Sequence, residues 1–190
     1  MTNVVLLGGN GYIGRTFTQK WMKKDPHAHF YVVSRSGKNQ LTSPQITNLK
    51  ADVTNFANVD KVMPDKIDYI VDFIGAPEKD PTKFKRINDL PAEIMLEIAK
   101  KYHVKAMGFI GGSLGDKQFV QGKKKLAKML KDSEIRTEVV SPTLVYGNGR
   151  KDSMTKFVPL LKFMGLFSKK LKPVDVNDVA NKLVNKMING

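Results

Sequence analysis

Residues 8–14 are Gly-Gly-Asn-Gly-Tyr-Ile-Gly, and this spacing of glycines suits the binding of a pyrophosphate. The segment follows the apolar run 4–7 and leads into an amphipathic stretch over 12–24. Glycines allow a tight turn close to an anion, and the first N–H groups and positive dipole end of a helix face that anion. An ordinary glycine turn is the alternative, but the strand–turn–helix context favours a dinucleotide site. The predicted cofactor-binding residues of this segment are Gly8, Asn10, Gly11, Tyr12, Ile13 and Gly14.

The residues about twenty positions beyond the glycines indicate which dinucleotide binds. In a sheet of this kind the second strand ends beside the adenosine ribose, where an acid bonds the 2′-hydroxyl of NAD or an arginine accommodates the 2′-phosphate of NADP. The chain has Ser34, Arg35 and Ser36 at this point and no carboxylate. A guanidinium with two hydroxyls suits a phosphate. We therefore expect NADP rather than NAD; the alternative is a solvated Arg35 in a surface turn.

Two more strand ends supply candidate cofactor contacts. Asp52 and Val53 follow the third predicted strand, where Asp52 could accept a hydrogen bond from the adenine amino group. Gly75 and Ala76 end the fourth, where small residues let the backbone approach a ligand. A loop aspartate is more commonly a cap or a solvated charge. Ligands of open α/β sheets, however, bind at the carboxyl ends of the strands, where all these residues fall.

The elements that must position these residues alternate along the chain. Apolar runs predict strands over 3–7, 30–34, 47–49, 69–74, 106–110 and 137–141. Helical patterns lie over 12–24, 55–62, 82–102, 116–132, 152–166 and 175–188. Pro91 predicts a kink in the helix over 82–102, or a short first helix that ends at Leu90.

This alternation predicts an α/β fold, a Rossmann-like doubly wound parallel sheet with helices on both faces. The length of 190 residues favours a single NAD(P)-binding domain over 1–190. We expect its core over 1–147 and a small substrate-side, C-terminal helical extension over 148–190.

Composition narrows the class of protein. The chain has no Cys, which excludes disulfides and thiolate chemistry and fits a reducing compartment. No apolar run approaches the ~20 residues of a membrane span, and the chain opens in a predicted strand rather than in a signal sequence. We expect a cytoplasmic protein without a membrane span. His27 and His29 lack a third ligand nearby, so no metal site is expected.

The net charge of +14 favours anionic ligands. Residues 116–172 contain 14 Lys and Arg against 5 Asp and Glu. Neither an aromatic-interleaved basic stripe nor zinc-finger spacing accompanies this excess, so nucleic acid is only a remote alternative as a partner.

Taken together, these motifs resemble the short-chain dehydrogenase/reductase superfamily, in its extended and atypical branches of nucleotide-sugar epimerase-like and NmrA-like proteins. The resemblance also includes Asn88 and three later segments, which are Phe109-Ile110-Gly111-Gly112-Ser113, Pro142-Thr143-Leu144-Val145-Tyr146-Gly147 and 173–180. It implies NAD(P) binding, with Pro142 and Leu144 among the cofactor contacts. Dimers are common in the resembled family, so a homo-oligomer is possible.

The resemblance further implies a catalytic set of Ser, Tyr and Lys, the last two spaced Tyr-x-x-x-Lys on a helix. The Lys lowers the pKa of the Tyr, the Tyr exchanges a proton with the substrate oxygen, and the Ser holds that oxygen. Ser113 matches the serine position. Counting back from Pro142 without gaps puts Lys123 on the lysine, beside the nicotinamide ribose, and Phe119 on the tyrosine. A second register uses Lys125 and Gln121.

Both registers lack the tyrosine, and Tyr146 is the candidate substitute for its proton. The expected function is NADP(H)-dependent hydride transfer to a small carbonyl, quinone or flavin-like acceptor, with an unknown small-molecule substrate. The first alternative is a non-catalytic NAD(P)-binding sensor or structural subunit. A nucleic-acid-associated basic protein is the remote one.

Overall fold

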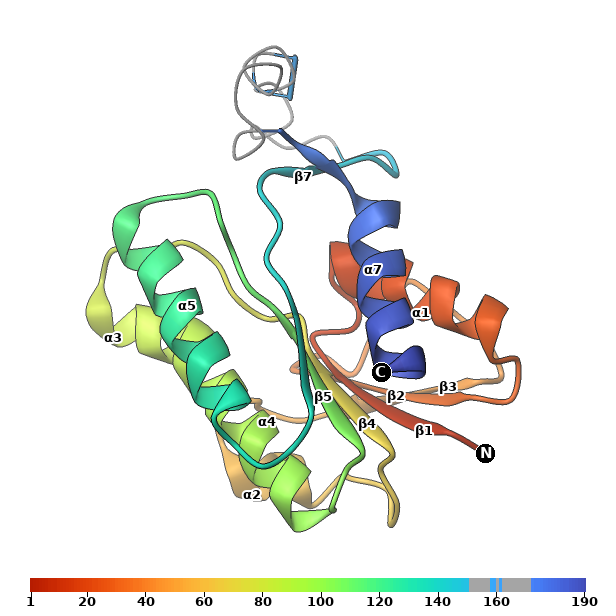
Figure 1. The fold of residues 1–190 in the computed structure, drawn as a ribbon. Helices are drawn as coiled ribbons and strands as arrows, with labels where there is room; N and C mark the ends of the chain where they lie inside the picture. The colour runs from red at the N-terminus through yellow and green to blue at the C-terminus, as the bar shows by residue number, and fades with distance from the viewer. Residues whose placement is uncertain (151–157, 160, 162–171) are drawn as a thin grey trace.

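The computed structural model describes residues 1–150, 158, 159, 161 and 172–190. Its centre is a six-stranded parallel sheet with the strand order β3-β2-β1-β4-β5-β6 (Figure 1). The strands are β1 (Asn3–Leu7), β2 (His29–Ser34), β3 (Ile46–Lys50), β4 (Tyr69–Asp72), β5 (Ala106–Ile110) and β6 (Thr137–Val140). The chain order reverses between β1 and β4, and open α/β sheets bind ligands at such a switch point. The predicted doubly wound fold is confirmed.

Helices cover both faces of this sheet (Figure 1). On one face α1 (Tyr12–Lys24) packs against α7 (Val176–Asn189). On the other lie α2 (Phe56–Asp60), α4 (Leu90–Lys101) and α5 (Lys117–Lys131). The predicted helix over 175–188 is therefore α7, and it belongs to the same layer as α1.

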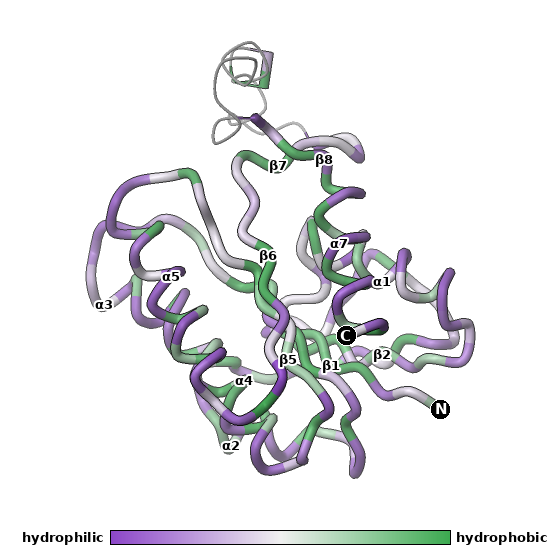
Figure 2. The backbone as a smooth tube through the Cα atoms, viewed as in Figure 1, coloured by the Kyte–Doolittle hydropathy of each residue, from purple (hydrophilic) through white to green (hydrophobic). Residues whose placement is uncertain are grey.

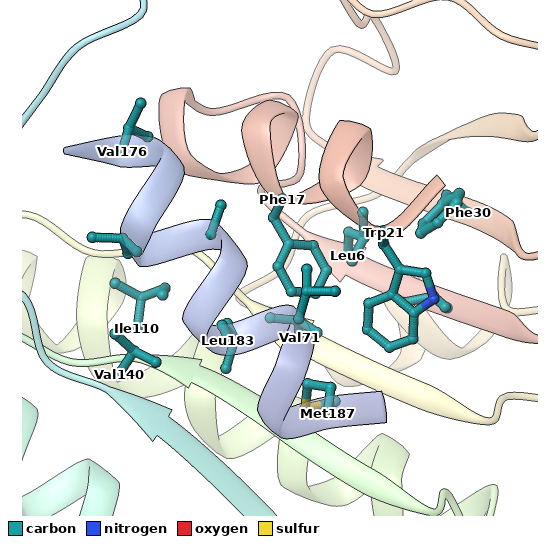
Figure 3. Packing of buried hydrophobic residues seen from close by; sticks show 14 of the residues in the cluster. Leu6, Phe17, Trp21, Phe30, Val71, Ile110, Val140, Val176, Leu183 and Met187 are labelled. Atoms are coloured by element: carbon teal, nitrogen blue, oxygen red, sulfur yellow. The ribbon is translucent and has the colours of Figure 1, made fainter. Parts of the chain in front are cut away.

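The alternation of side chains along β1 shows why both faces need cover. Val4 and Leu6 enter the cluster under α1 and α7, whereas Val5 and Leu7 enter the cluster under α2, α4 and α5. Hydrophobic residues accordingly run through the central strands, as Figure 2 shows, and an apolar run of this kind is typical of a strand buried on both faces. In the first cluster Phe17 and Trp21 meet edge to face, with ring centroids 5.4 Å apart, beside α7 (Figure 3).

The helix predicted over 82–102 is divided into three parts. It consists of α3 (Pro81–Phe84), the π-helical segment η1 (Lys85–Asp89) and then α4. Pro91 lies in the first turn of α4, where its missing N–H is not needed. A proline ring would collide with the carbonyl four residues earlier in a continuous α-helix, and the wider π turn relieves this contact. The short first helix therefore ends at Phe84, and its predicted end at Leu90 was wrong.

Other differences from the predicted elements are small. The strand predicted over 69–74 ends at Asp72, and the sequence pattern missed the two-residue strands β7 (Val145–Tyr146) and β8 (Val174–Asp175), which pair in parallel. The helix predicted over 152–166 falls almost entirely on residues outside the described ranges. In the described part of the chain no helix is both long and apolar enough to cross a membrane.

Candidate functional site

The glycine segment forms a tight turn between β1 and α1. Gly8 has a φ of +71°, which favours glycine, and its N–H donates to the carbonyl of Val33 on β2 at 3.1 Å. A Cβ on Gly14 would lie 2.6 Å from the carbonyl oxygen of Gly9, so only glycine fits at this position. Its missing side chain lets α1 lie close to the turn. The N-cap of α1 is Gly11, which has no side chain to satisfy the first-turn N–H groups. This geometry suits an anion at the start of α1.

A cavity of ≈ 520 Å³ opens beside this turn, at the carboxyl ends of β1, β2 and β3. It brings together five of the predicted cofactor residues, namely Gly8, Ser34, Arg35, Asp52 and Val53. Its other lining residues are Val33, Thr54, Ile74, Lys83, Arg86 and Ile87. Mixed apolar and charged lining of this kind suits a nucleoside that carries a phosphate.

Hydrogen bonds join the loop after β2 to the glycine turn. Asn10 donates from Nδ2 to the carbonyl of Lys38 at 3.0 Å and accepts from the N–H of Gln40 at 3.0 Å. The hydroxyls of Ser34 and Ser36 accept from backbone N–H groups within the loop, at 3.1 and 3.2 Å. The two serines thus shape the loop that presents Arg35, and only Ser34 of the pair lines the cavity.

Asp52 is held in place by the residue two positions on. Its Oδ1 accepts from the N–H of Thr54 at 3.0 Å and from the Thr54 hydroxyl at 2.8 Å. These two hydrogen bonds, helped by the charges of Arg86 and Arg35, lower the pKa of Asp52 although partial burial opposes them. The carboxylate is therefore favoured in its ionised form.

A buried charge pair lies under the end of β4. Lys123, which is 3% exposed, donates from Nζ to the carbonyl of Ile74 at 2.8 Å and lies 4.5 Å above the centre of the Phe109 ring. Burial lowers the pKa of Lys123, and the charges of Asp72 and Asp89 oppose this shift. Asp72 is fully buried, and burial raises its pKa to about 6 against the opposing charge of Lys123.

The turn after β4 packs against Lys123. Gly75 has a φ of +147°, and a Cβ there would lie 2.6 Å from Lys123 Cε. Asn88 Oδ1 accepts from the N–H of Ala76 at 3.2 Å, and its Nδ2 donates to the carbonyl of the same residue at 3.0 Å. Three of the predicted site residues, Lys123, Gly75 and Ala76, therefore lie together.

The orientation of α5 distinguishes the two registers for the catalytic lysine. A Cβ on Gly112 would lie 2.7 Å from Phe119 Cε1, so the Phe119 ring packs on the segment that carries Ser113. One turn later, on the same side of the helix, comes buried Lys123. Gln121 and Lys125 instead line a separate outer groove with Glu93 of α4. The register with Phe119 at the tyrosine position is the one that faces the sheet, and the Gln121–Lys125 register faces outward.

The remaining predicted residues lie on the segments that follow β5 and β6. Ser113 is exposed, and its N–H donates to the carbonyl of Pro142 at 3.0 Å. Leu144 is buried, and its carbonyl accepts a hydrogen bond from the N–H of Val174. Tyr146 is partly buried on β7. The Tyr12 hydroxyl donates to the carbonyl of Gly147 at 2.7 Å, which ties this segment to the start of α1. Pro142 thus contacts Ser113 through its carbonyl, while Tyr146 belongs to the separate β7–β8 pair.

The two histidines considered as metal ligands have other surroundings. His29 Nε2 lies 2.8 Å from Thr47 Oγ1, and His27 donates its backbone N–H to Asp25 in the turn after α1. Within the described ranges, no three His, Cys, Asp or Glu side chains are grouped closely enough to hold a metal ion.

A known protein family matches the part of the chain that contains this site. The model of the NAD dependent epimerase/dehydratase family matches residues 4–147, which include the glycine turn, the cavity and the Phe119–Lys123 face of α5. The chain belongs to the NAD-dependent epimerase/dehydratase family. The resemblance found in the sequence is confirmed, and membership of this family supports an NAD(P)-dependent, oxidoreductase-like protein.

Solved structures of low sequence identity share the fold of this epimerase/dehydratase family member. A short chain dehydrogenase family protein from Francisella tularensis aligns with a TM-score of 0.71 at 15% identity, over 98% of this chain and 91% of that one. dTDP-glucose 4,6-dehydratase from Bacillus anthracis, in complex with NAD, aligns with a TM-score of 0.72 at 18% identity, over 100% of this chain and 73% of that one. The enzyme WbmH from Bordetella bronchiseptica, in complex with NAD+, aligns with a TM-score of 0.72 at 16% identity, over 98% of this chain and 72% of that one.

Proposed function

We propose that this protein binds NADP(H) and transfers hydride between the nicotinamide and a small carbonyl, quinone or flavin-like acceptor. The observation that carries the choice of NADP is the cavity beside the glycine turn. Arg35 lines it at the end of β2, where an NAD-binding site would offer a carboxylate to the ribose. A guanidinium at this point attracts a 2′-phosphate and leaves a 2′-hydroxyl without its usual acceptor.

Each part of the site has a role in this proposal. The turn at Gly8–Gly14 offers N–H groups to the pyrophosphate, and Asp52 and Val53 border the adenine. Gly75 and Ala76 leave room for the nicotinamide half next to Lys123, with Pro142 and Leu144 on the side of Ser113. NADPH, when bound, supplies the hydride.

Proton transfer is the step in which this chain departs from its family. The Ser113 hydroxyl is exposed and can hold a substrate oxygen, but the Phe119 ring beside it has no proton to give. The proton then comes from water or from Tyr146. Acceptors that are readily reduced need no strong protein acid, because the cofactor carries the hydride chemistry. This is why quinones, flavins and activated carbonyls are the proposed acceptors.

Replacement of Arg35 by alanine tests the cofactor preference. We expect NADP+ affinity to fall by roughly tenfold to a hundredfold, the usual cost of losing a charge-assisted hydrogen bond, with NAD+ affinity unchanged. Lys38→Ala is the matched control, because Lys38 is exposed in the same loop but does not line the cavity. Calorimetric titration measures both. Equal affinity for the two nucleotides, unaffected by Arg35→Ala, would contradict the proposal.

A second candidate function, a non-catalytic NAD(P)-binding module, is favoured by Phe119 at the tyrosine position. Oxidation of NADPH in the presence of a panel of quinones, flavins and aldehydes separates the two. Under our proposal turnover occurs, and Ser113→Ala lowers kcat without changing NADP+ affinity. Tight binding of NADP+ with no turnover on the whole panel would favour the binding module instead.

A further inference from the structure

The cavity beside the glycine turn has a second wall that the strand ends do not supply. Lys83, Arg86 and Ile87 line it from α3 and η1. These positions are three and four residues apart, so they share one side of the helical path. Cations therefore face the cavity from Arg35 on one wall and from Lys83 and Arg86 on the other.

The packing of this second wall fixes its position. Phe84 and Asn88 are both buried, whereas Lys83 and Arg86 are exposed. A Cβ on Gly122 of α5 would lie 2.5 Å from Phe84 Cζ, and Asn88 is hydrogen-bonded to Ala76 through both ends of its amide. Arg86 lies between these two anchored residues, so the backbone that carries it is held against the end of β4.

The charges around the cavity do not balance. Among the described residues that line it, Arg35, Lys83 and Arg86 face the single carboxylate of Asp52. Asp52 is already bonded through Oδ1 to Thr54, and both guanidinium groups are close enough to influence its ionisation. Two positive charges thus remain without a counterion in the cavity lining, and a phosphate monoester would supply close to two negative charges at neutral pH.

We propose that Arg86, with Lys83, forms the second half of a phosphate clamp whose first half is Arg35, and that this clamp selects dinucleotides phosphorylated on the adenosine ribose. The inference rests on the proposed NADP(H) function and names a specificity determinant on a different element. A phosphate monoester has three terminal oxygens, so guanidinium groups from two walls can bind it at once. A ribose with free hydroxyls offers the second wall no negative charge.

Substitution of Arg86 by glutamine, which keeps a polar side chain but removes the charge, tests the clamp. The ligands are NADP+ and 2′,5′-ADP, which carry the 2′-phosphate, and NAD+ and 5′-AMP, which lack it. We expect Arg86→Gln to lower the affinity for NADP+ and 2′,5′-ADP by about tenfold or more. Its affinity for NAD+ and 5′-AMP should stay within about twofold of wild type. 2′,5′-ADP has no nicotinamide, so this readout is independent of turnover. Calorimetric titration measures all four.

Lys85→Gln is the matched control, because Lys85 is the exposed neighbour of Arg86 on η1 and does not line the cavity. It removes the same charge from the same π-helical segment, so its affinities should equal those of wild type. A melting temperature of Arg86→Gln equal to that of Lys85→Gln shows that the fold is intact.

The outcomes separate this inference from the proposed function. If wild type prefers NADP+ but Arg86→Gln binds all four ligands as wild type does, or loses affinity for all four equally, the clamp is refuted and the NADP(H) proposal stands. If wild type binds NADP+ and NAD+ equally, the NADP preference itself fails. 3′,5′-ADP is a further control, and binding of it as tight as that of 2′,5′-ADP would refute recognition of the 2′ position.

Discussion

A Gly14→Val protein is expected to lose detectable NADP+ binding and about 3 kcal/mol of its free energy of unfolding, at the upper end of the cost of overpacking. A Cβ at this position would lie within 2.8 Å of three backbone atoms of Gly9, and backbone cannot rotate away as a side chain would. The turn or the helix must move instead. Either shift displaces the N–H groups that are placed to meet the pyrophosphate.

Urea unfolding and calorimetric titration with NADP+ measure the two effects. Gln19→Val is the matched control, because Gln19 is exposed on the same helix and the substitution adds the same β-branched side chain. The control should lose well under 1 kcal/mol, the helix-propensity difference, and should bind the nucleotide as wild type does. Wild-type affinity in Gly14→Val would show that the close approach of α1 to the turn is not needed for binding.

Lys123→Met is the second substitution with a large expected effect, a loss of about 3 kcal/mol or more in the free energy of unfolding at about pH 8. Lys123 is the cation whose charge opposes the burial of Asp72. Without it Asp72 must either ionise in an apolar site or keep a proton that the unfolded state would release, and its Oδ2 has no hydrogen-bond partner within the described part of the chain. Removing one member of a buried pair costs more than the pair itself contributes.

The loss should depend on pH with a definite sign. In wild type the pKa of Asp72 rises from 3.8 to about 6 on folding, so the native state holds this proton more tightly than the unfolded state does. This group therefore makes stability fall as pH rises through that interval, with no further change above it. Lys123→Met raises the pKa of Asp72 beyond 6, so in the variant the fall continues to higher pH.

Urea unfolding at about pH 5.5 and about pH 8 checks this expectation, since the difference between variant and wild type should grow with pH. Lys124→Met is the control, because Lys124 is the exposed neighbour of Lys123 on α5. The double variant Asp72→Asn, Lys123→Met has neither charge of this pair and should recover much of the lost stability at the higher pH. A pH-independent loss in Lys123→Met would mean that the lysine acts there through packing alone.

The sheet was predictable because its strands are continuous apolar runs separated by glycines and amphipathic helices. Val4–Leu7 and the run around Ile70 could only be strands covered on both faces, and this cover required helices between them. The strands β7 and β8 could not be predicted, because two residues are too few for a periodicity. Pro91 indicated a break in its helix, but no residue pattern identifies a π turn.

Part of the candidate site could be predicted because its residues follow predictable strands. Arg35 and Asp52 follow strands at fixed offsets from the glycine turn, so the fold class alone assigns them to the cavity. Arg86 has no such offset, since it reaches the cavity through the unpredicted η1 segment. Asp72 did leave a signal, as a lone acid inside the apolar run 69–74. A charge in such a position needs a partner, and Lys123 could have been sought for that reason.

The pairing of α1 with α7 has a consequence for synthesis of the chain on the ribosome. Phe17 and Trp21 belong to a cluster that is complete only when residues 176–189 pack against α1, although the glycine turn that α1 continues lies much earlier in the chain. A nascent chain stalled before position 176 therefore exposes this aromatic face to chaperones. The packing of α1, the helix that continues the glycine turn, is therefore complete only after α7 has been synthesised.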